Sequence, residues 1–280
     1  MLPFEIAFAG SVPLDRIRFE ALEAPPLPEA LQATIDEKWH GVLAKNPSAF
    51  DGPNMSTRDI IPPYKDRAPD ETYVWTDMII KYWPTTYTKF SGTTFPEIKD
   101  QYGEDAVHTG SAVCAVIKTP DNNIVLHLRG RDMGYRRRLH VPGGILAEPD
   151  PVAAIKKEVE EELGISYDEC PMPTLLGIVQ DTTPGRWNHE FCFLIKVPFE
   201  MEEMKRRHEG ATSKDEGFLL PFPATEEHLT AILELGDEHA PDIWVPTGMA
   251  ALILYGRSQG WWQNTGCPKL LAELRDKGIL

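Results

Sequence analysis

Three glutamates at helical spacing are the residues of this 280-residue chain that could do chemistry together. Glu158, Glu161 and Glu162 stand at positions i, i+3 and i+4, so a helix would carry them on one face. Like charges at that spacing cost a helix about 0.2–0.5 kcal/mol per pair. Converging carboxylates are, however, ligands that hard divalent cations such as Mg²⁺ and Mn²⁺ prefer. The run therefore indicates either a metal site or an ordinary solvated helix face.

The segment around these glutamates has the end signals of a helix over residues 151–163. Asp150 suits the N-cap, Pro151 suits the first helical position, and Gly164 suits the residue just past the end. An apolar stripe recurs at the helical repeat and consists of Val152, Ile155, Val159 and Leu163. The three glutamates flank this core-facing stripe, whereas Glu160 points away.

A Val-Pro-Gly-Gly turn at residues 141–144 lies directly upstream of the helix. A strand, a glycine turn, a short loop and a carboxylate-bearing helix can place backbone carbonyls and carboxylates around one metal ion. This combination favours the metal site over the solvated helix face.

The run from residue 157 to residue 165, Lys-Glu-Val-Glu-Glu-Glu-Leu-Gly-Ile, resembles the second half of the Nudix hydrolase box. That box runs Gly, five residues, Glu, seven residues, Arg-Glu, an aliphatic, any residue, Glu-Glu, any residue, Gly, an aliphatic. Lys157 stands in the Arg position and cannot form a bidentate fork. The first half, counted from Gly144, is one residue short, so Glu148 reaches its position only if the loop contracts.

The resemblance implies an α/β fold, namely the Nudix αβα sandwich with a mixed sheet, and hydrolysis of a nucleoside diphosphate linked to another moiety. It implies that Mg²⁺, or Mn²⁺, is held by the three helix glutamates with a backbone carbonyl of Gly143 or Gly144 assisting. A further carboxylate would complete the metal site or act as base, and the candidates are Glu190, Asp215 and Glu216. The expected catalytic residues are Glu161, Glu162 and Glu216, and Glu190 is the expected additional metal ligand.

Segments outside the box resemble the UDP-glucose/UDP-galactose diphosphatase type of this family. They are LAKNP at 43–47, FDG at 50–52, YTKFSGT at 87–93, LGI at 176–178 and AALILYGRSQG at 250–260. The implied products are UMP and a sugar 1-phosphate. Cleavage of ADP-ribose or another dinucleotide is the alternative within the enzyme class. A Nudix module that senses a nucleotide without turning it over is the alternative outside it.

Five arginines gather between an expected strand and the glycine turn, which is unexpected in an acidic chain. They are Arg129, Arg131, Arg136, Arg137 and Arg138. Arg129 and Arg137 are the candidates for contact with substrate phosphate, and a solvated loop that pairs with local acids is the simpler interpretation. Tyr87 is the candidate for stacking on a base, although aromatic side chains in such segments usually pack. We expect His127, His140 and His189 to be structural.

The composition and the pattern of expected elements divide the chain into three parts. Residues 1–105 form an N-terminal α+β extension, either a cap over the pocket or part of a dimer interface; residues 106–262 form the Nudix domain; residues 263–280 form a tail helix. We expect a helix between Pro28 and Pro47, a loop over 51–70, helix or strand over 75–90, and a helix followed by a loop over 201–217. Expected strands lie at 111–119, 123–130, 174–182, 189–197 and 217–222, with a buried helix at 245–260.

The composition limits the partners. Lys and Arg total 28 against 43 Asp and Glu, a formal charge of −15. This disfavours a nucleic acid polymer or an anionic membrane as partner, whereas a small phosphorylated substrate remains compatible if a cation joins it. We see no signal peptide and no membrane span, and four scattered cysteines indicate reduced thiols, with Cys114 and Cys192 in the core. We therefore expect a cytoplasmic protein that binds a small nucleotide, with a homodimer as one option.

Overall fold

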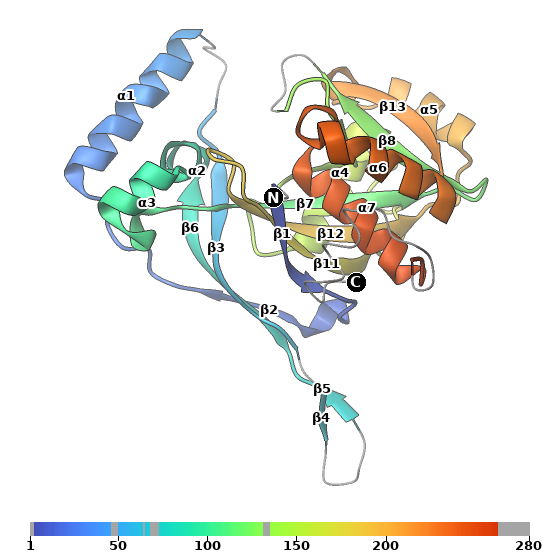
Figure 1. Cartoon of the computed structure of the whole chain (residues 1–280), viewed down its shortest axis with the longest axis horizontal. Helices are drawn as coiled ribbons and strands as arrows, with labels where there is room; N and C mark the ends of the chain where they lie inside the picture. The colour runs from blue at the N-terminus through green and yellow to red at the C-terminus, as the bar shows by residue number, and fades with distance from the viewer. Residues whose placement is uncertain (1–2, 46–49, 64, 68–72, 131–134, 263–280) are drawn as a thin grey trace.

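The computed structural model describes residues 3–45, 50–63, 65–67, 73–130 and 135–262 (Figure 1). Its large sheet runs in the order β1-β11-β12-β7-β8-β13, with β10 paired to β7 and β9 paired to β8. The strands are β1 (Phe4–Ala9), β7 (Gly110–Lys118), β8 (Asn123–Arg129), β9 (Leu139–His140), β10 (Gly143–Ile145), β11 (Thr174–Asp181), β12 (Asn188–Lys196) and β13 (Gly217–Pro223). The pair β12–β7 is parallel and the others are antiparallel, so the sheet is mixed.

Helices cover both faces of this sheet. They are α4 (Pro151–Leu163), α5 (Met201–Glu209), α6 (Glu226–Ile243) and α7 (Pro246–Ser258). Successive side chains of β7 point to opposite faces. Val113 therefore packs in one core with Ile155 of α4, whereas Cys114 packs in the other with Leu254 of α7. The predicted αβα sandwich with a mixed sheet is confirmed.

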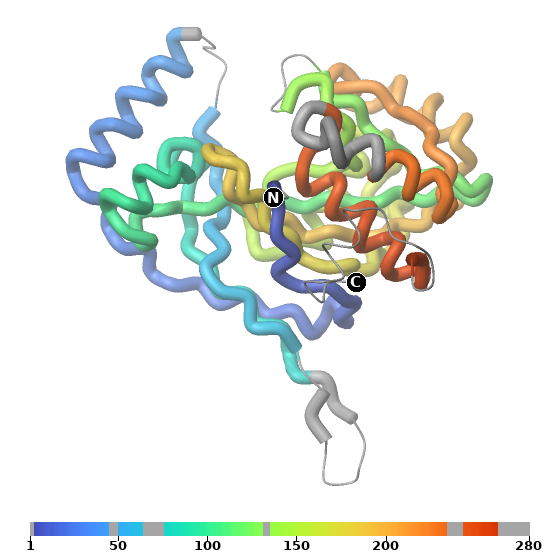
Figure 2. Tube along the Cα trace, viewed as in Figure 1, coloured from blue at the N-terminus to red at the C-terminus, as the bar shows by residue number. Residues whose placement is uncertain are grey.

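The N-terminal part adds a second, three-stranded sheet in the order β2-β6-β3. Its elements are β2 (Ile17–Ala21), α1 (Glu29–Lys45), β3 (Pro53–Ile61), β4 (Lys65–Arg67), β5 (Tyr73–Trp75), β6 (Met78–Thr86), α2 (Tyr87–Thr93) and α3 (Pro96–Tyr102). Short 3₁₀ turns lie at Leu14–Arg16, Glu104–Ala106 and Lys214–Glu216. Figure 2 shows α1, α2 and α3 at one end of the molecule and α4 to α7 at the other.

The N-terminal part packs against the large sheet through polar and apolar contacts. Ser111 of β7 lies 2.7 Å from Thr57 between hydroxyl oxygens, and its amide donates to Asn54 Oδ1 at 3.2 Å. Trp187, in the turn between β11 and β12, packs with Leu31 and its neighbours on α1 and α3. The N-terminal part therefore rests on the beginning of β7 and on the β11–β12 turn.

The strands and helices expected over 106–262 are present, whereas α6, β9 and β10 were not predicted, and the N-terminal elements depart further from the predictions. The expected loop over 51–70 is wrong for residues 53–61 and 65–67, which form β3 and β4. Pro53 opens β3 and Pro62 follows it, so the prolines mark the ends of this strand. The segment 75–90 contains both a strand and the start of a helix. The sequence pattern assigns residues 1–105 to the N-terminal extension. Within this range, however, β1 belongs to the large sheet, because it pairs with β11 at the edge of that sheet.

Some sequence predictions lie outside the described residues. These are the tail helix at 263–280, Arg131, Cys267, and the Asn46 and Pro47 of the LAKNP segment. Among the helices that the structure describes, none combines the length and the apolar character that crossing a membrane requires.

His108, just before β7, predicts an acid sensitivity of the fold. It is 1% exposed, and Nδ1 lies 2.9 Å from Thr85 Oγ1. Burial, together with the charges of Lys89 and Arg58, lowers its pKa from 6.5 to about 4. As the pH falls from 6.5 towards 4, His108 therefore becomes protonated in the unfolded chain but stays neutral in the folded chain. The free energy of unfolding decreases as a result. At pH 4.5 the loss is on the order of 2–3 kcal/mol.

We expect His108→Asn, which retains a polar atom near Thr85, to lose less stability than the unsubstituted protein between pH 7 and pH 4.5. Urea unfolding at both pH values measures the difference. His40→Asn, the same substitution at an exposed position, provides the control for effects of the substitution itself. Equal losses in the unsubstituted protein and in His108→Asn would contradict this account.

Candidate active site

The helix α4 is fixed at both ends as its sequence predicts. Asp150 Oδ1 accepts a hydrogen bond from the amide of Ala153 at 2.9 Å. Gly164 adopts the left-handed conformation, with φ 68°, and its amide donates to Glu160 O at 3.0 Å. The residues of the apolar stripe that are fully buried are Ile155, Val159 and Leu163. Caps and stripe together set the rotation of the helix, and this directs its glutamates towards β10.

The glycine turn lies directly against two of these glutamates. The amide of Gly143 donates to Glu162 Oε2 at 3.2 Å. Gly144 faces Glu158 so closely that a Cβ atom there would overlap the Glu158 carboxylate. Gly143 itself leaves no room on the other side, because its Cβ would overlap the carbonyl oxygen of Val113 on β7. The structure thus brings together the turn and the helix that the sequence pattern joins.

The electrostatics of these carboxylates are unusual. Glu162 is 2% exposed, and burial, followed by the charges of Glu158 and Glu216, raises its pKa well above the usual value. Burial and the charge of Glu161 raise the pKa of Glu158 to about 7. Arg129 acts in the opposite direction on both groups. Two acids are therefore held where their negative charge is costly, and a cation would relieve that cost.

Glu161 and Glu216 lie at the edge of this pair. Glu161 is more exposed, and its Oε1 lies 3.4 Å from Lys157 Nζ, so the lysine in the Arg position of the box contacts a box glutamate. Glu216 ends the 3₁₀ turn before β13, and its carbonyl accepts a hydrogen bond from Gly130 at 2.6 Å. Its charge acts on both Glu158 and Glu162. Four carboxylates from two segments thus share one region.

The fit of this region to a divalent cation rests on donor chemistry. In the described part of the chain, no three acidic, histidine or cysteine side chains already converge at metal-ligand spacing. Glu161 is instead paired with Lys157, and Glu162 is bonded to the Gly143 amide. Carboxylate oxygens are what Mg²⁺ and Mn²⁺ prefer, and the raised pKa values of Glu158 and Glu162 mark the charge that a cation would offset. The residues present therefore fit such a cation.

The structure does not bring Glu190 into this region. Phe191 and Phe193 of β12 pack in the core that contains α4, so Glu190 and Cys192 point to the other face, towards α7. Glu190 Oε1 lies 3.4 Å from His140 Nε2. Burial acts to raise the pKa of Glu190, but the bond to His140 and one to Thr247 outweigh it and hold this pKa below the usual value. Glu190 thus belongs to a separate buried polar contact.

The predicted substrate-binding residues lie in two places. Arg129, at the end of β8, is partly buried and acts electrostatically on the α4 carboxylates. Arg137 is exposed and has a positive φ of 56°. Tyr87 opens α2 in the N-terminal part, where its ring centroid lies 6.0 Å from that of Phe90. Arg129 thus acts on the carboxylates, Arg137 is bonded to the backbone of Arg129, and Tyr87 is engaged in packing.

His127 is a residue whose place in the site the sequence reasoning missed. It is 2% exposed, and its Nδ1 lies 3.8 Å from Glu162 Oε1. Neither ring nitrogen has a hydrogen-bond partner among the described residues. Burial and the charge of Arg129 lower its pKa to about 3, so the ring is neutral. Side chains two residues apart in a strand lie on the same face, and Val125 faces α4. This alternation was the signal that could have placed His127 on the face that α4 covers.

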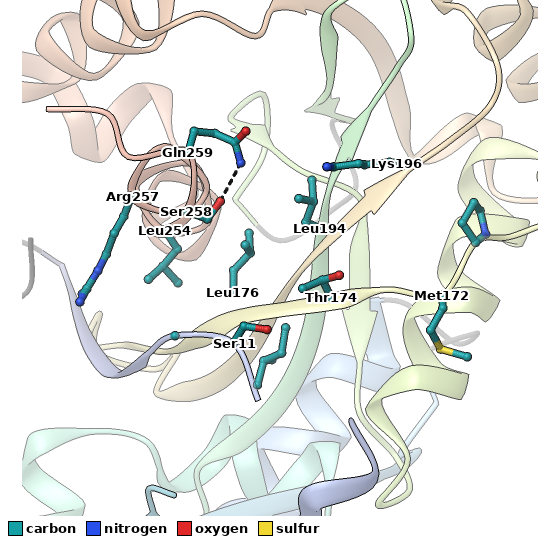
Figure 3. A pocket seen from close by; sticks show the side chains of 13 residues that line it. Ser11, Met172, Thr174, Leu176, Leu194, Lys196, Leu254, Arg257, Ser258 and Gln259 are labelled. Atoms are coloured by element: carbon teal, nitrogen blue, oxygen red, sulfur yellow. Dashed lines mark hydrogen bonds between the residues drawn. The ribbon is translucent and has the colours of Figure 1, made fainter. Parts of the chain in front are cut away.

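A separate groove lies at the far end of α7 (Figure 3). It has a volume of about 580 Å³, with Leu176, Leu194 and Leu254 along its floor and Lys196 and Arg257 at its sides. The described residues that line it include no carboxylate and none of the α4 residues, so it is distinct from the region around Glu158.

No protein-family model matches this chain, and no curated protein sequence compared with it does either. Solved structures do resemble it. One is a MutT Nudix hydrolase from Burkholderia pseudomallei, which is 22% identical in sequence. The match spans 51% of this chain and 95% of that protein, with a TM-score of 0.36. A Nudix hydrolase from Nitrosomonas europaea is 24% identical, with coverages of 53% and 88% and a TM-score of 0.37. A MutT/Nudix family protein from Listeria innocua is 18% identical, with coverages of 54% and 94% and a TM-score of 0.40. Each of these likenesses spans about half of this chain.

Proposed function

We propose that this protein is a Nudix-type hydrolase that cleaves a nucleoside diphosphate linked to a second moiety with the help of a divalent cation. The observation that carries the proposal is the packing of the buried Glu162 and the half-buried Glu158 against the Gly143–Gly144 turn. A solvated helix face would leave such glutamates in water, where their charge costs little. Here burial and mutual repulsion raise both pKa values, and a cation is the partner that would reverse this effect.

In this proposal Glu158, Glu161 and Glu162 hold Mg²⁺ or Mn²⁺, and Glu216 stands beside them as a further ligand or as the base. When bound, the cation supplies neutralisation of the diphosphate charge and lowers the pKa of water. The Gly143 amide orients Glu162, and neutral His127 lies along its other oxygen. Lys157 is ion-paired with Glu161. The hydrogen bond from Gly143 and the close packing of Glu158 on Gly144 orient two of the carboxylates before substrate arrives, which favours catalysis by preorganisation.

The substrate class follows from charge. Arg129 supplies positive charge beside an acidic site, which suits a diphosphate bridged by a cation. The finer assignment, UDP-sugar cleaved to UMP and a sugar 1-phosphate, is supported by the sequence resemblance outside the box. Tyr87 is its candidate base contact. ADP-ribose and other diphosphates share the chemistry and differ only in the moieties attached. The cytoplasmic location and the homodimer stay predictions.

Product release from a substrate panel tests this function. The panel contains UDP-glucose, UDP-galactose, ADP-ribose, diadenosine polyphosphates and dNTPs, each with Mg²⁺, with Mn²⁺ and with a chelator. We expect cation-dependent release of UMP from the UDP-sugars. Turnover of ADP-ribose or another member instead would retain the chemistry and overturn the UDP-sugar assignment. Binding of nucleotides without turnover of any member would overturn the enzyme and favour a sensor.

A further inference from the structure

Tyr135 links two loops at one end of the large sheet. Its hydroxyl donates to Asp181 Oδ2 at 2.6 Å, and Asp181, at the end of β11, is 1% exposed. The amide of Thr183 donates to the other carboxylate oxygen at 2.8 Å. Burial, together with the charge of Asp181, raises the pKa of Tyr135, so the phenol keeps its proton. The β8–β9 connection is thereby tied to the β11–β12 turn.

Two guanidinium groups also contact the Tyr135 ring. The Cζ atoms of Arg138 and Arg186 lie 5.0 and 5.2 Å from its centroid. Both distances are within the range of a cation–π interaction. Arg138 belongs to the same loop as Tyr135, and Arg186 belongs to the β11–β12 turn. The tyrosine therefore has a hydrogen bond and a ring contact with the same neighbouring turn.

The backbone of residues 135–138, which we call the arginine loop, is held in a costly conformation. Tyr135 and Arg137 have φ values of 54° and 56°, in the left-handed region that residues with a side chain adopt at a cost of about 1–2 kcal/mol each. Hydrogen bonds to the end of β8 support it: Arg137 N donates to Arg129 O, and Arg129 N donates to Arg138 O, each at 3.0 Å. Arg136 and Arg137 are exposed in this arrangement.

The arginine loop is hydrogen-bonded to the backbone of Arg129, whose charge acts on the α4 carboxylates. That charge opposes the rise in pKa that burial causes at both Glu158 and Glu162. The residue after Arg129, Gly130, donates its amide to Glu216 O at 2.6 Å. Three consecutive arginines, 136–138, thus belong to a loop that is bonded to the end of β8, in a chain whose formal charge is −15. A strained loop with this charge and place suits the binding of an anion.

We propose that Tyr135, through its bond to Asp181, is a positioning residue that holds the arginine loop where Arg136 and Arg137 take the diphosphate of the substrate. The inference rests on the proposed function for its substrate class. Loss of the tether lets the loop leave its strained conformation and lowers the population that can bind the anion. The effect falls on substrate affinity, because Tyr135 itself touches none of the α4 carboxylates that the structure describes.

The test uses Tyr135→Phe, which keeps the ring and removes the hydroxyl, and Asp181→Asn. We expect KM for UDP-glucose to rise about tenfold with kcat within twofold, and the affinity for inorganic pyrophosphate with Mg²⁺, measured by calorimetry, to fall by a similar factor. Asp181→Asn replaces the charged acceptor with a neutral amide and so weakens the same bond, and the double variant should therefore be no worse than Tyr135→Phe alone. Tyr167→Phe, at an exposed tyrosine, is the matched control.

Arg137→Gly is a second test variant, chosen because it should fold even if Tyr135→Phe or Asp181→Asn does not. Glycine accepts a positive φ without strain, so this variant should melt no lower than the unsubstituted protein while binding pyrophosphate more weakly. Pyrophosphate binding also separates this inference from the proposed function. If the protein hydrolyses nothing in the panel but Tyr135→Phe binds pyrophosphate tenfold more weakly, the function fails and the inference holds. Absence of pyrophosphate binding, or equal affinity in Tyr135→Phe, overturns the inference.

Discussion

Replacing Glu158 with glutamine is expected to lower kcat/KM of the cation-dependent hydrolysis about 10³-fold or more. The variant loses a charged ligand of the cation, and such a ligand contributes several kcal/mol to the stabilisation of the transition state. Stability should not fall with activity. Burial raises the pKa of Glu158 to about 7, so a neutral side chain costs the metal-free fold little, and we expect Tm to stay the same or to rise by a few degrees. Steady-state kinetics and thermal melting without metal measure the two effects.

Glu160 provides the matched control for this substitution. It lies on the same helix, two residues along, and it is exposed. Glu160→Gln removes the same charge from α4 without touching the glycine turn, so we expect kcat/KM within threefold of that of the unsubstituted protein. If Glu158→Gln retained activity at the level of Glu160→Gln, the assignment of Glu158 to the metal site would be wrong.

Gly144→Ala is expected to abolish most of the activity while the fold stays intact. The added methyl group would overlap the end of the Glu158 side chain, which can rotate away at little cost to stability. The carboxylate would then leave the turn, and we expect cation-dependent kcat/KM to fall at least 30-fold, about 2 kcal/mol. Tm should change by only a few degrees.

Gly143→Ala, one residue earlier, should behave in the opposite way. Its methyl group would overlap the carbonyl oxygen of Val113 and the backbone of Cys114, which cannot move without breaking the pairing of β10 with β7. We therefore expect a much lower Tm, or no folded protein, for Gly143→Ala. Circular dichroism melts and kinetics on both variants make the comparison. An active Gly144→Ala, or equal Tm losses in the two variants, would exclude the proposed contact with Glu158.

The box region could be predicted from sequence because its signals are local. The cap at Asp150, the stop at Gly164 and the apolar stripe between them all lie within 15 residues, and the helix follows them residue for residue. The face of the large sheet on which Glu190 lies could not be predicted in this way. Both faces of the sheet are covered, so the run that follows Glu190, from Phe191 to Ile195, is apolar at every position, and alternation gives no direction.

The remaining features depend on contacts between distant segments. Tyr135 and Asp181 are 46 residues apart in the chain, and only the pairing of the strands brings them together. His127 reaches Glu162 because β8 packs against α4. Alternation along β8 places His127 on the same face as Val125, but it does not reveal that α4 covers this face. Prolines hid β3 for a different reason, since they lie at its first position and just past its end and so resemble the signals of a loop.

Direct measurement of Mn²⁺ binding tests the central claim, that the α4 carboxylates and the glycine turn form a divalent-cation site. Electron paramagnetic resonance of free Mn²⁺ in titrations of the full chain gives the affinity and the number of ions, independently of any substrate. We predict at least one bound Mn²⁺ per chain, competed by Mg²⁺, with affinity reduced at least tenfold in both Glu158→Gln and Glu162→Gln and unchanged in Glu160→Gln. No binding, or equal binding by all three variants, would contradict the account.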